Sequence, residues 1–155
     1  EGEKVILNSN ADAWIIRTSW LFSPYGKNFV KKILFLLQKK NKINVISDQI
    51  GSPTYALDLA RDILKILSDK ISNNGSKIFH YTNAGQSTWY EFALKIKELS
   101  KLSCNINPIE TNEYRSSAKR PKYSILSSEN FTKEFNIRPR PWELALEDCL
   151  SKMIK

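Results

Sequence analysis

Residues 13–20 read Ala-Trp-Ile-Ile-Arg-Thr-Ser-Trp, and this stretch decides the fold class. A continuous apolar run that ends in polar residues is typical of a strand that is buried on both faces of a parallel sheet, with its carboxyl end at a ligand site. The segments that follow alternate between helical and extended apolar spacing. We therefore predict an α/β protein.

Working outward from this strand, capping residues and apolar spacing predict the remaining elements. Loop 48–54 contains Gly51 and Pro53, which forbid a helix or strand to continue through it, and the polar stretch 110–121 is predicted to be irregular. The predicted elements are a helix over 29–38, a strand over 43–47, a helix from the N-cap Thr54 to about Leu67, a turn at 73–75, a strand over 77–82, a helix from Thr88 to about Leu99, a weak strand over 106–109, a helix from Ser127 or Ser128 to Phe135 and a helix from Pro141 to about Met153.

The first strand has no certain parallel partner among these short strands. We therefore expect its neighbours to belong to chain that precedes residue 1. The predicted fold is the C-terminal part of a Rossmann-like doubly wound sheet plus a small α/β substrate-binding domain.

Composition excludes several classes of protein. With 41% hydrophobic residues, the chain can form a core, and it has neither a signal peptide nor an apolar run that could cross a membrane, so we expect a cytoplasmic protein.

The formal net charge of +8 comes from scattered lysines and one cluster, which we interpret as a solvated helix face and not as a nucleic-acid site. Cys104 and Cys149 lack metal-ligand spacing and are expected to be inert thiols. The cluster consists of Lys27, Lys31, Lys32, Lys39, Lys40 and Lys42.

Motifs for self-contained catalysis are missing from these residues. The five glycines are too widely spaced to form the turn that binds a dinucleotide pyrophosphate, and no tyrosine has a lysine four residues later. His80, the single histidine, is predicted to be a packed strand residue, so we predict no metal site.

Four stretches, taken in order, carry a resemblance that covers nearly the whole chain. They resemble the C-terminal half of the dTDP-4-dehydrorhamnose reductases, which are extended short-chain dehydrogenases/reductases. The opening Glu1-Gly2-Glu3 is similar to residues that follow the family's Tyr-x-x-x-Lys, so the resemblance implies that the catalytic tyrosine and lysine lie before residue 1. The stretches are Arg17-Thr18-Ser19-Trp20, Gly26-Lys27-Asn28-Phe29, Asp48-Gln49-Ile50-Gly51-Ser52-Pro53-Thr54, and Arg120-Pro121 with Ser124.

The resemblance implies roles for residues of these stretches. Thr18 and Ser19 would face the nicotinamide of NADPH, and Trp20 would offer a flat wall to a sugar ring or else be an ordinary core aromatic. Asn28 and Phe29 would hold the thymine or a phosphate, or else only cap and pack their helix.

Loops 48–54 and 110–121 would supply the other ligands. Gln49, Gly51 and Thr54 would bind substrate, although Gly51 is equally explained by its backbone dihedral angles. Arg120 suits a diphosphate because a guanidinium donates a bidentate fork, and Lys119 would add charge; the alternative is a solvated loop arginine. We expect Trp20, Asn28, Gln49 and Arg120 to surround one cleft.

The function implied by the resemblance is the nucleotide-sugar-binding part of an NADPH-dependent reductase that converts dTDP-4-dehydro-L-rhamnose to dTDP-L-rhamnose, with this chain inactive alone. It also implies a homodimer and Mg²⁺, although the sequence contains no acidic cluster for the ion. The alternative is a reductase-like regulatory module without catalysis. A nucleic-acid-binding protein is the third alternative, which a steep salt dependence would reveal.

Overall fold

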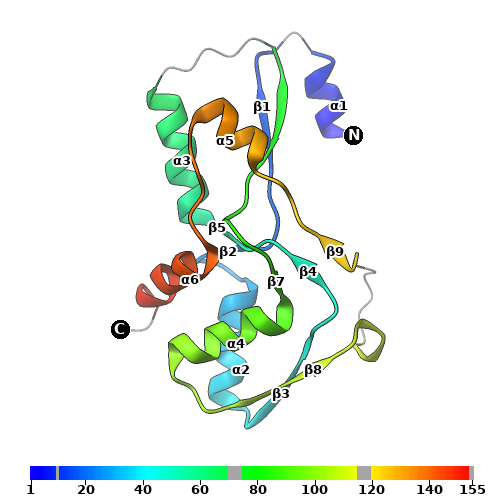
Figure 1. The fold of residues 1–155 in the computed structure, drawn as a ribbon, viewed down its shortest axis with the longest axis vertical. Coiled ribbons are helices and arrows are strands. Elements are labelled where there is room, and N and C mark those ends of the chain that lie inside the picture. Colours follow the sequence, from blue (N-terminus) through cyan, green and yellow to red (C-terminus); the bar gives the residue numbers. More distant parts are fainter. Residues whose placement is uncertain (10, 70–74, 115–119, 154–155) are drawn as a thin grey trace.

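The computed structural model describes residues 1–9, 11–69, 75–114 and 120–153. Figure 1 shows an elongated molecule, with β1 and β6 in one half and α2, α4, β3 and β8 in the other. The elements are α1 (Gly2–Leu7), β1 (Trp14–Arg17), β2 (Leu21–Phe22), α2 (Phe29–Lys39), β3 (Lys42–Ile46), β4 (Ile50–Gly51), β5 (Thr54–Tyr55), α3 (Ala56–Ser68), β6 (Lys77–His80), β7 (Ser87–Thr88), α4 (Trp89–Ser100), β8 (Asn105–Ile109), the 3-10 helix η1 (Thr111–Glu113), β9 (Tyr123–Ser124), α5 (Glu129–Phe135) and α6 (Trp142–Ser151).

Strand β1 has a partner within the chain, contrary to our expectation. It pairs in parallel with β6, in a register that places Ile16 beside Phe79. One face of this pair packs with α3 and α5 in a core that includes Ile66 and Phe131. The opposite face carries Arg17, which forms an ion pair with Glu3 of α1.

The prediction that this strand is buried on both faces is wrong for the described residues. Its first three residues are only half-buried and Arg17 is exposed. The physical reason is that α1, the helix on the Arg17 side, is a short helix with no buried residue of its own. His80 is a half-buried residue of β6, consistent with the role of a packed strand residue.

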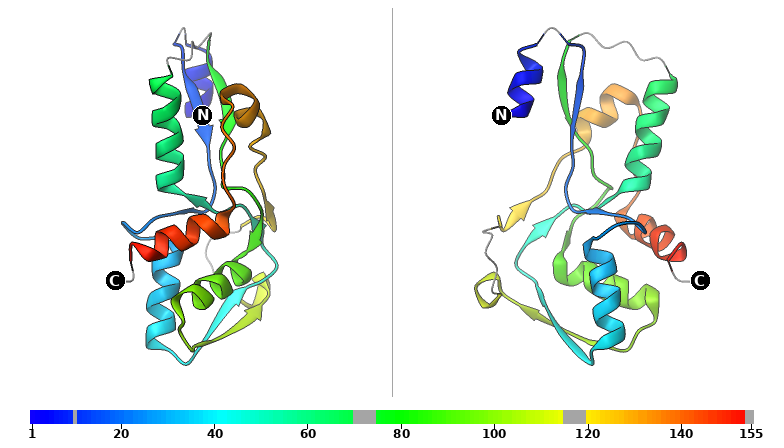
Figure 2. Two further views of the ribbon diagram at one scale, coloured as in Figure 1. Left: turned by 60° about the vertical axis from the view of Figure 1, so that its left-hand side comes forward. Right: turned by 180° about the vertical axis from the view of Figure 1, so that it is seen from behind.

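The other half is built on helices α2 and α4, which pack together in one core with β3 (Figure 2). The spacing of Val30, Ile33 and Leu37 places one face of α2 in this core, as predicted. Helix α4 begins at the capping box of Thr88 and Glu91, in which each side chain bonds to the backbone N–H of the other, and this prediction is also confirmed.

Four parallel ladders connect distant parts of the chain. They join β1 with β6, β2 with β5, β3 with β8 and β4 with β9, while β7 adds to β4 in antiparallel orientation. Parallel strands require crossover connections, so each ladder brings together residues that are far apart in sequence. The predicted α/β class is therefore confirmed.

Two predicted helix starts are corrected. Thr54 lies in β5 and is fully buried, and α3 begins after Tyr55 with no capping side chain. The backbone N–H of Tyr55, the residue at the N-cap position, donates to the Asn83 side chain (2.7 Å), so a tertiary contact holds the start of α3. Pro141 precedes α6 as its N-cap residue and does not begin the helix itself. The turn predicted at 73–75 falls mainly outside the described residues.

A buried carboxylate, Asp58 of α3, joins the two halves. Arg140 donates two hydrogen bonds of 2.8 Å to its oxygens, and Asn83 donates a third of 2.9 Å. The hydrogen bond to Asp58 is the main cause that raises the pKa of Arg140. This cluster ties α3, the loop after β6 and the start of α6 to one point.

Neither cysteine is paired, and both are buried. Burial raises the pKa of the Cys149 thiol to about 12, so the thiolate is not formed at neutral pH. Among the helices of the described residues, none combines the length and the apolar character that a membrane crossing requires.

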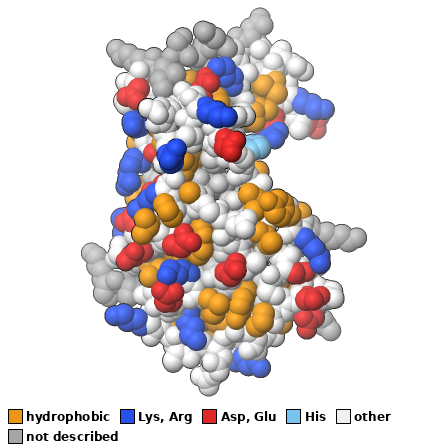
Figure 3. Space-filling view, in the orientation of Figure 1, with side chains coloured by type: hydrophobic (Ala, Val, Ile, Leu, Met, Phe, Trp, Pro, Cys, Tyr) orange, Lys and Arg blue, Asp and Glu red, His pale blue; other side chains and the backbone are white. Residues whose placement is uncertain are grey.

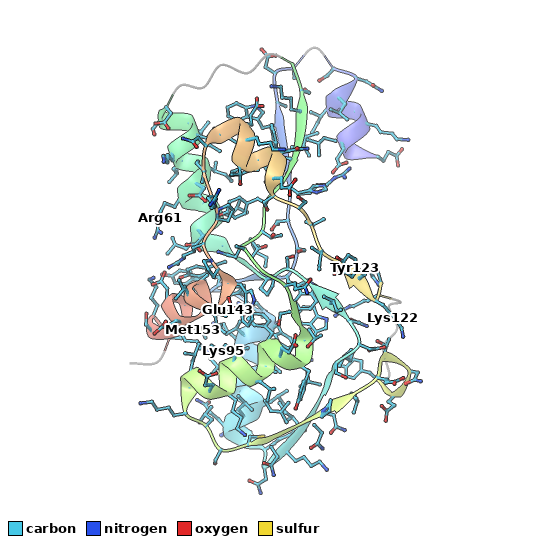
Figure 4. All side chains as sticks on the ribbon, viewed as in Figure 1. Arg61, Lys95, Lys122, Tyr123, Glu143 and Met153 are labelled. Atoms are coloured by element: carbon cyan, nitrogen blue, oxygen red, sulfur yellow. The ribbon has the colours of Figure 1, made fainter. Side chains whose placement is uncertain are left out.

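Replacing Arg140 with methionine should lower the free energy of unfolding by roughly 3 kcal/mol, because Asp58 would stay buried without its bidentate partner. Urea denaturation measures the loss. Arg61→Met is the matched control, since the Arg61 guanidinium lies 3.7 Å from the same carboxylate but its side chain is 62% exposed and points outward from α3 in Figure 4. Its loss should stay under about 0.5 kcal/mol. Equal losses would contradict the structural role of the buried pair.

Candidate functional site

Two adjoining cavities are lined by half of the predicted site residues. Each has a volume of about 410 Å³, and both are lined by Trp89 and Arg120. We call them the Trp20 cavity and the Phe29 cavity. The Trp20 cavity is lined by Ser19, Trp20, Gln49, Trp89, Arg120, Pro121 and Ser124. The Phe29 cavity is lined by Phe29, Lys32, Ile33, Leu36, Asn44, Val45, Ile46, Trp89, Tyr114 and Arg120.

The expected convergence holds for three of the four residues named for it. Trp20, Gln49 and Arg120 line one cavity, although they come from distant parts of the chain. A wider cavity of about 780 Å³ lies between residues 82–86 and 125–133 and contains none of the predicted site residues. In the space-filling view the surface is indented at the waist between the two halves, beside a group of hydrophobic side chains (Figure 3).

The indole of Trp20 is enclosed on both faces. Trp89 stacks on it, with ring centroids 3.5 Å apart and planes inclined by 9°. A Cβ on Gly51 would lie 2.4 Å from the ring-fusion atom Cε2 of Trp20. The same Cβ would lie 2.7 Å from both Cζ2 and Nε1, two atoms bonded to Cε2, so Gly51 lies over one face of the ring while Trp89 occupies the other. Trp20 therefore presents its edge to the cavity, and the flat wall that we expected is covered.

Gly51 is explained by this close approach. Its φ lies outside the left-handed region, so the dihedral explanation offered by the sequence is wrong. Trp20 itself carries the unusual backbone, with a φ of +46°, and its carbonyl accepts a hydrogen bond from the N–H of Thr54 (3.2 Å). A bulky residue in this conformation is strained, so the surrounding contacts must hold it there.

Gln49 is buried and its amide is engaged at both ends. The Trp89 indole N–H donates to its Oε1 (3.2 Å), and its Nε2 donates to the Thr111 hydroxyl (3.0 Å). Only 3% of the residue is exposed. Gln49 therefore connects the stacked tryptophans to the segment that follows β8.

Asn28 and Phe29 have separate positions. The side-chain oxygen Oδ1 of Asn28 accepts from Lys31 N–H at the start of α2, and its side-chain amide nitrogen donates to the backbone oxygens of Ser23 and Tyr25. Asn28 thus caps the helix and lines neither cavity. The Phe29 ring packs against Trp89 at 4.6 Å and lines the cavity that bears its name.

The remaining predicted residues divide between surface, cavity and core. Thr18 is exposed just beyond β1, and Ser19 donates to the Ser52 carbonyl (2.7 Å) at the edge of the Trp20 cavity. Thr54 is fully buried, and its hydroxyl has no hydrogen-bond partner among the described residues. Arg120 is exposed between the two cavities. Lys119 lies outside the described residues.

Sequence reasoning gave no role to several residues of this site. Trp89 lines both cavities, and its signal was an aromatic residue directly after the capping residue Thr88. Asp48 accepts hydrogen bonds from the N–H (2.9 Å) and hydroxyl (2.6 Å) of Thr111, and its other oxygen lies 3.3 Å from the ammonium of Lys122. These contacts, the Thr111 hydroxyl first, lower the pKa of Asp48.

The lysine cluster is exposed, as predicted, but Lys32 also lines the Phe29 cavity. No group of three or more His, Cys, Asp or Glu side chains that could hold a metal ion occurs within the described residues.

The parallel ladders define the class as an α/β protein, and solved structures that resemble it are reductases of the Rossmann-like, extended short-chain dehydrogenase/reductase fold. The family model described as RmlD substrate binding domain matches residues 1–155, and the chain belongs to this family.

Relatives of known sequence and structure agree with this assignment. The chain is 42% identical to the spore coat polysaccharide biosynthesis protein SpsK of Bacillus subtilis over 97% of the chain and 51% of that protein. It is 36% identical to a dTDP-4-dehydrorhamnose reductase of Aggregatibacter actinomycetemcomitans over 96% of the chain and 53% of that protein. The crystal structure of the Bacillus anthracis dTDP-4-dehydrorhamnose reductase in complex with NADP superposes with a TM-score of 0.87 at 35% identity, covering 97% of this chain and 52% of the other. The chain thus spans about half the length of these relatives.

Substituting Gly51 with alanine should break the tryptophan stack, because the new Cβ would lie 2.4 Å from the Trp20 ring. We expect a loss of about 1–3 kcal/mol of stability and a weaker near-ultraviolet circular dichroism signal from the two indoles. Gly2→Ala is the control, since no atom lies within 4 Å of a Cβ there, and its stability should change by less than about 0.5 kcal/mol. An unchanged aromatic signal in Gly51→Ala would refute the enclosed position of Trp20.

Proposed function

We propose that this chain forms the nucleotide-sugar-binding part of an NADPH-dependent reductase that converts dTDP-4-dehydro-L-rhamnose to dTDP-L-rhamnose. The observation that carries the proposal is the pair of cavities that share Trp89 and Arg120. A nucleotide sugar has a base, a diphosphate and a sugar in linear order, and the two cavities with an arginine between them match this order.

The Phe29 cavity suits the thymine base. Its walls combine the aromatic rings of Phe29, Trp89 and Tyr114 with the apolar side chains of Ile33 and others, and aromatic walls of this kind bind planar heterocycles by stacking. Lys32 at the same cavity adds a positive charge for the phosphates. Asn28 would act here only through its cap of α2.

Arg120 suits the diphosphate. It lines both cavities, so a guanidinium there can reach a group that passes from one to the other. Its fork of donors matches phosphate oxygens in a bidentate manner. Lys119, as its neighbour in sequence, would add charge.

The Trp20 cavity would hold the sugar. The hydroxyls of Ser19 and Ser124 donate to backbone oxygens but keep lone pairs for sugar hydroxyls, and the Trp20 edge bounds the ring. Gly51 and Thr54 would shape this cavity from behind.

Thr18 would contact the nicotinamide ring, since it follows β1 and ligands of parallel sheets bind at the carboxyl ends of strands. NADPH would supply the hydride to the 4-keto carbon. The NADP bound to the Bacillus anthracis structure supports this choice of cofactor. The cytoplasmic location and the homodimer stay predictions of the sequence.

Replacing Arg120 with alanine should weaken the binding of dTDP-L-rhamnose by about 1.5–3 kcal/mol, roughly 10- to 150-fold in Kd, because a charged hydrogen bond to the diphosphate is lost. Isothermal titration calorimetry measures the change. Arg61→Ala, an exposed arginine of α3, is the control and should leave Kd unchanged. An Arg120→Ala variant with the parent affinity would reject Arg120 as the diphosphate ligand.

A polypeptide of these 155 residues alone should not oxidise NADPH in the presence of dTDP-4-dehydrorhamnose. Its sequence contains neither a glycine-rich pyrophosphate turn nor Tyr-x-x-x-Lys to donate the proton. Absorbance at the reduced nicotinamide band measures turnover. Activity of the purified chain would contradict the division of roles proposed above.

A further inference from the structure

We propose that Asp48 is a positioning residue that clamps the segment bearing Arg120 and, through Thr111 and Gln49, orients the tryptophan pair of the site. The inference rests on the proposed function, since it concerns how the same site is held in its binding geometry. We call Asp48, Gln49, Thr111 and Lys122 the Asp48 clasp.

The first step is the position of Asp48 between two parallel ladders. The β3–β8 register pairs Ile46 with Ile109, so Asp48 and Thr111 each lie two residues beyond that pair. The β4–β9 ladder begins with Ile50 beside Tyr123, and the N–H of Ile50 donates to the carbonyl of Lys122 (2.8 Å). One carboxylate thus faces the end of one ladder and the beginning of the other.

The second step is that Asp48 contacts both Thr111, which follows β8, and Lys122, which precedes β9. One carboxylate oxygen accepts the N–H and hydroxyl of Thr111, and the other attracts the Lys122 ammonium. Arg120 lies two residues before Lys122, which projects from the same side of the molecule as Tyr123 in Figure 4. The Lys122 contact therefore places Asp48 next to the backbone that carries Arg120.

The third step is a directed chain of hydrogen bonds. The ionised carboxylate of Asp48 can only accept hydrogen bonds, so the Thr111 hydroxyl uses its hydrogen to donate to Asp48. In its bond with Gln49 Nε2 the same hydroxyl is therefore the acceptor. The Gln49 oxygen then faces Trp89, whose indole N–H only donates. The Asp48 carboxylate at one end and the Trp89 indole at the other therefore require the same direction for every bond between them, and Trp89 stacks on Trp20.

This arrangement changes the role expected for Gln49. Its amide is buried and engaged by Trp89 and Thr111, so Gln49 acts on substrate by holding Trp89 in place. Asp48 acts twice, through Trp89 on the sugar side and through Lys122, two residues from Arg120, on the diphosphate side.

The test is a double-mutant cycle for the binding of dTDP-L-rhamnose, read by calorimetry. Asp48→Asn should weaken binding roughly tenfold when Arg120 is present, because the amide no longer attracts Lys122 and no longer fixes the Thr111 hydroxyl. In the Arg120→Ala background the same change should weaken binding by less than about threefold, because the two residues act together. Lys95→Met, which breaks the separate exposed pair with Glu98 on α4, is the matched control and should leave Kd unchanged.

A second pair of variants covers the case in which Asp48→Asn fails to fold. Thr111→Val removes the hydroxyl of the relay, whereas Thr111→Ser keeps it. We expect Thr111→Val to weaken binding several-fold and to shift the tryptophan fluorescence of the unliganded protein, and Thr111→Ser to retain both parent values. A clasp needed only for stability would lower the melting temperature in these variants without this split in affinity.

The outcomes separate the two proposals. If Arg120→Ala weakens binding but Asp48→Asn does not, or if their effects are additive, the clasp is overturned and the nucleotide-sugar site stands. If Arg120→Ala has no effect, the proposed diphosphate role fails first. In that case the tryptophan fluorescence of Thr111→Val still decides whether the relay orients the indoles, and an unchanged spectrum overturns it.

Discussion

The buried carboxylate of Asp58 is the constraint on which the arrangement of the site depends. A charge with 6% of its side chain exposed is costly unless it is paired and fully hydrogen-bonded, and Arg140 and Asn83 together meet this requirement. Asn83 is thereby fixed, and its side-chain oxygen Oδ1 accepts from Tyr55 N–H while its backbone N–H donates to the Pro53 carbonyl. Loop 51–55 is thus braced from behind by a side chain that the buried charge holds in place.

The consequence reaches the cavity through Gly51. Because loop 51–55 is braced, the Gly51 backbone forms a fixed floor against which the Trp20 ring lies. The left-handed backbone of Trp20 would relax if either contact were lost, since strain of this kind persists only where neighbours over-determine the geometry. Trp89 then completes the enclosure from α4. The buried ion pair of Asp58 and Arg140 therefore helps to hold the stacked pair of Trp20 and Trp89 in place.

Local signals in the sequence were enough for the elements but not for these contacts. The period of Val30, Ile33 and Leu37, the capping box at Thr88 and the polar end of the first strand are all encoded within a few residues, so helices α2 and α4 and strand β1 could be predicted. The failures were tertiary. Thr54 was predicted to be the N-cap because its residue type favours that role. It lies instead in β5, and the N–H of the next residue, Tyr55, donates to the side chain of Asn83, 28 positions away. Three of the four residues expected at one cleft converge there, because each lies at the end of an element. The side chain of Asn28 instead caps its own helix, α2.

The pairing of Asp48 with Thr111 required the strand register, and Pro108 helps to fix it. Along β8, the backbone N–H of Asn105 donates to the Asn41 carbonyl and the carbonyl of Ile109 accepts from the Ser47 N–H. The backbone N–H and C=O groups of the odd-numbered residues therefore point toward β3, and those of the even-numbered residues point away. Pro108 has no N–H, and in this register the missing donor falls on the side away from the ladder. A slip by one residue would turn Pro108 toward β3, remove a ladder hydrogen bond and rotate Ile106 out of the core. A proline within a short edge strand therefore excludes the alternative register, and the surviving register is the one that sets Thr111 opposite Asp48.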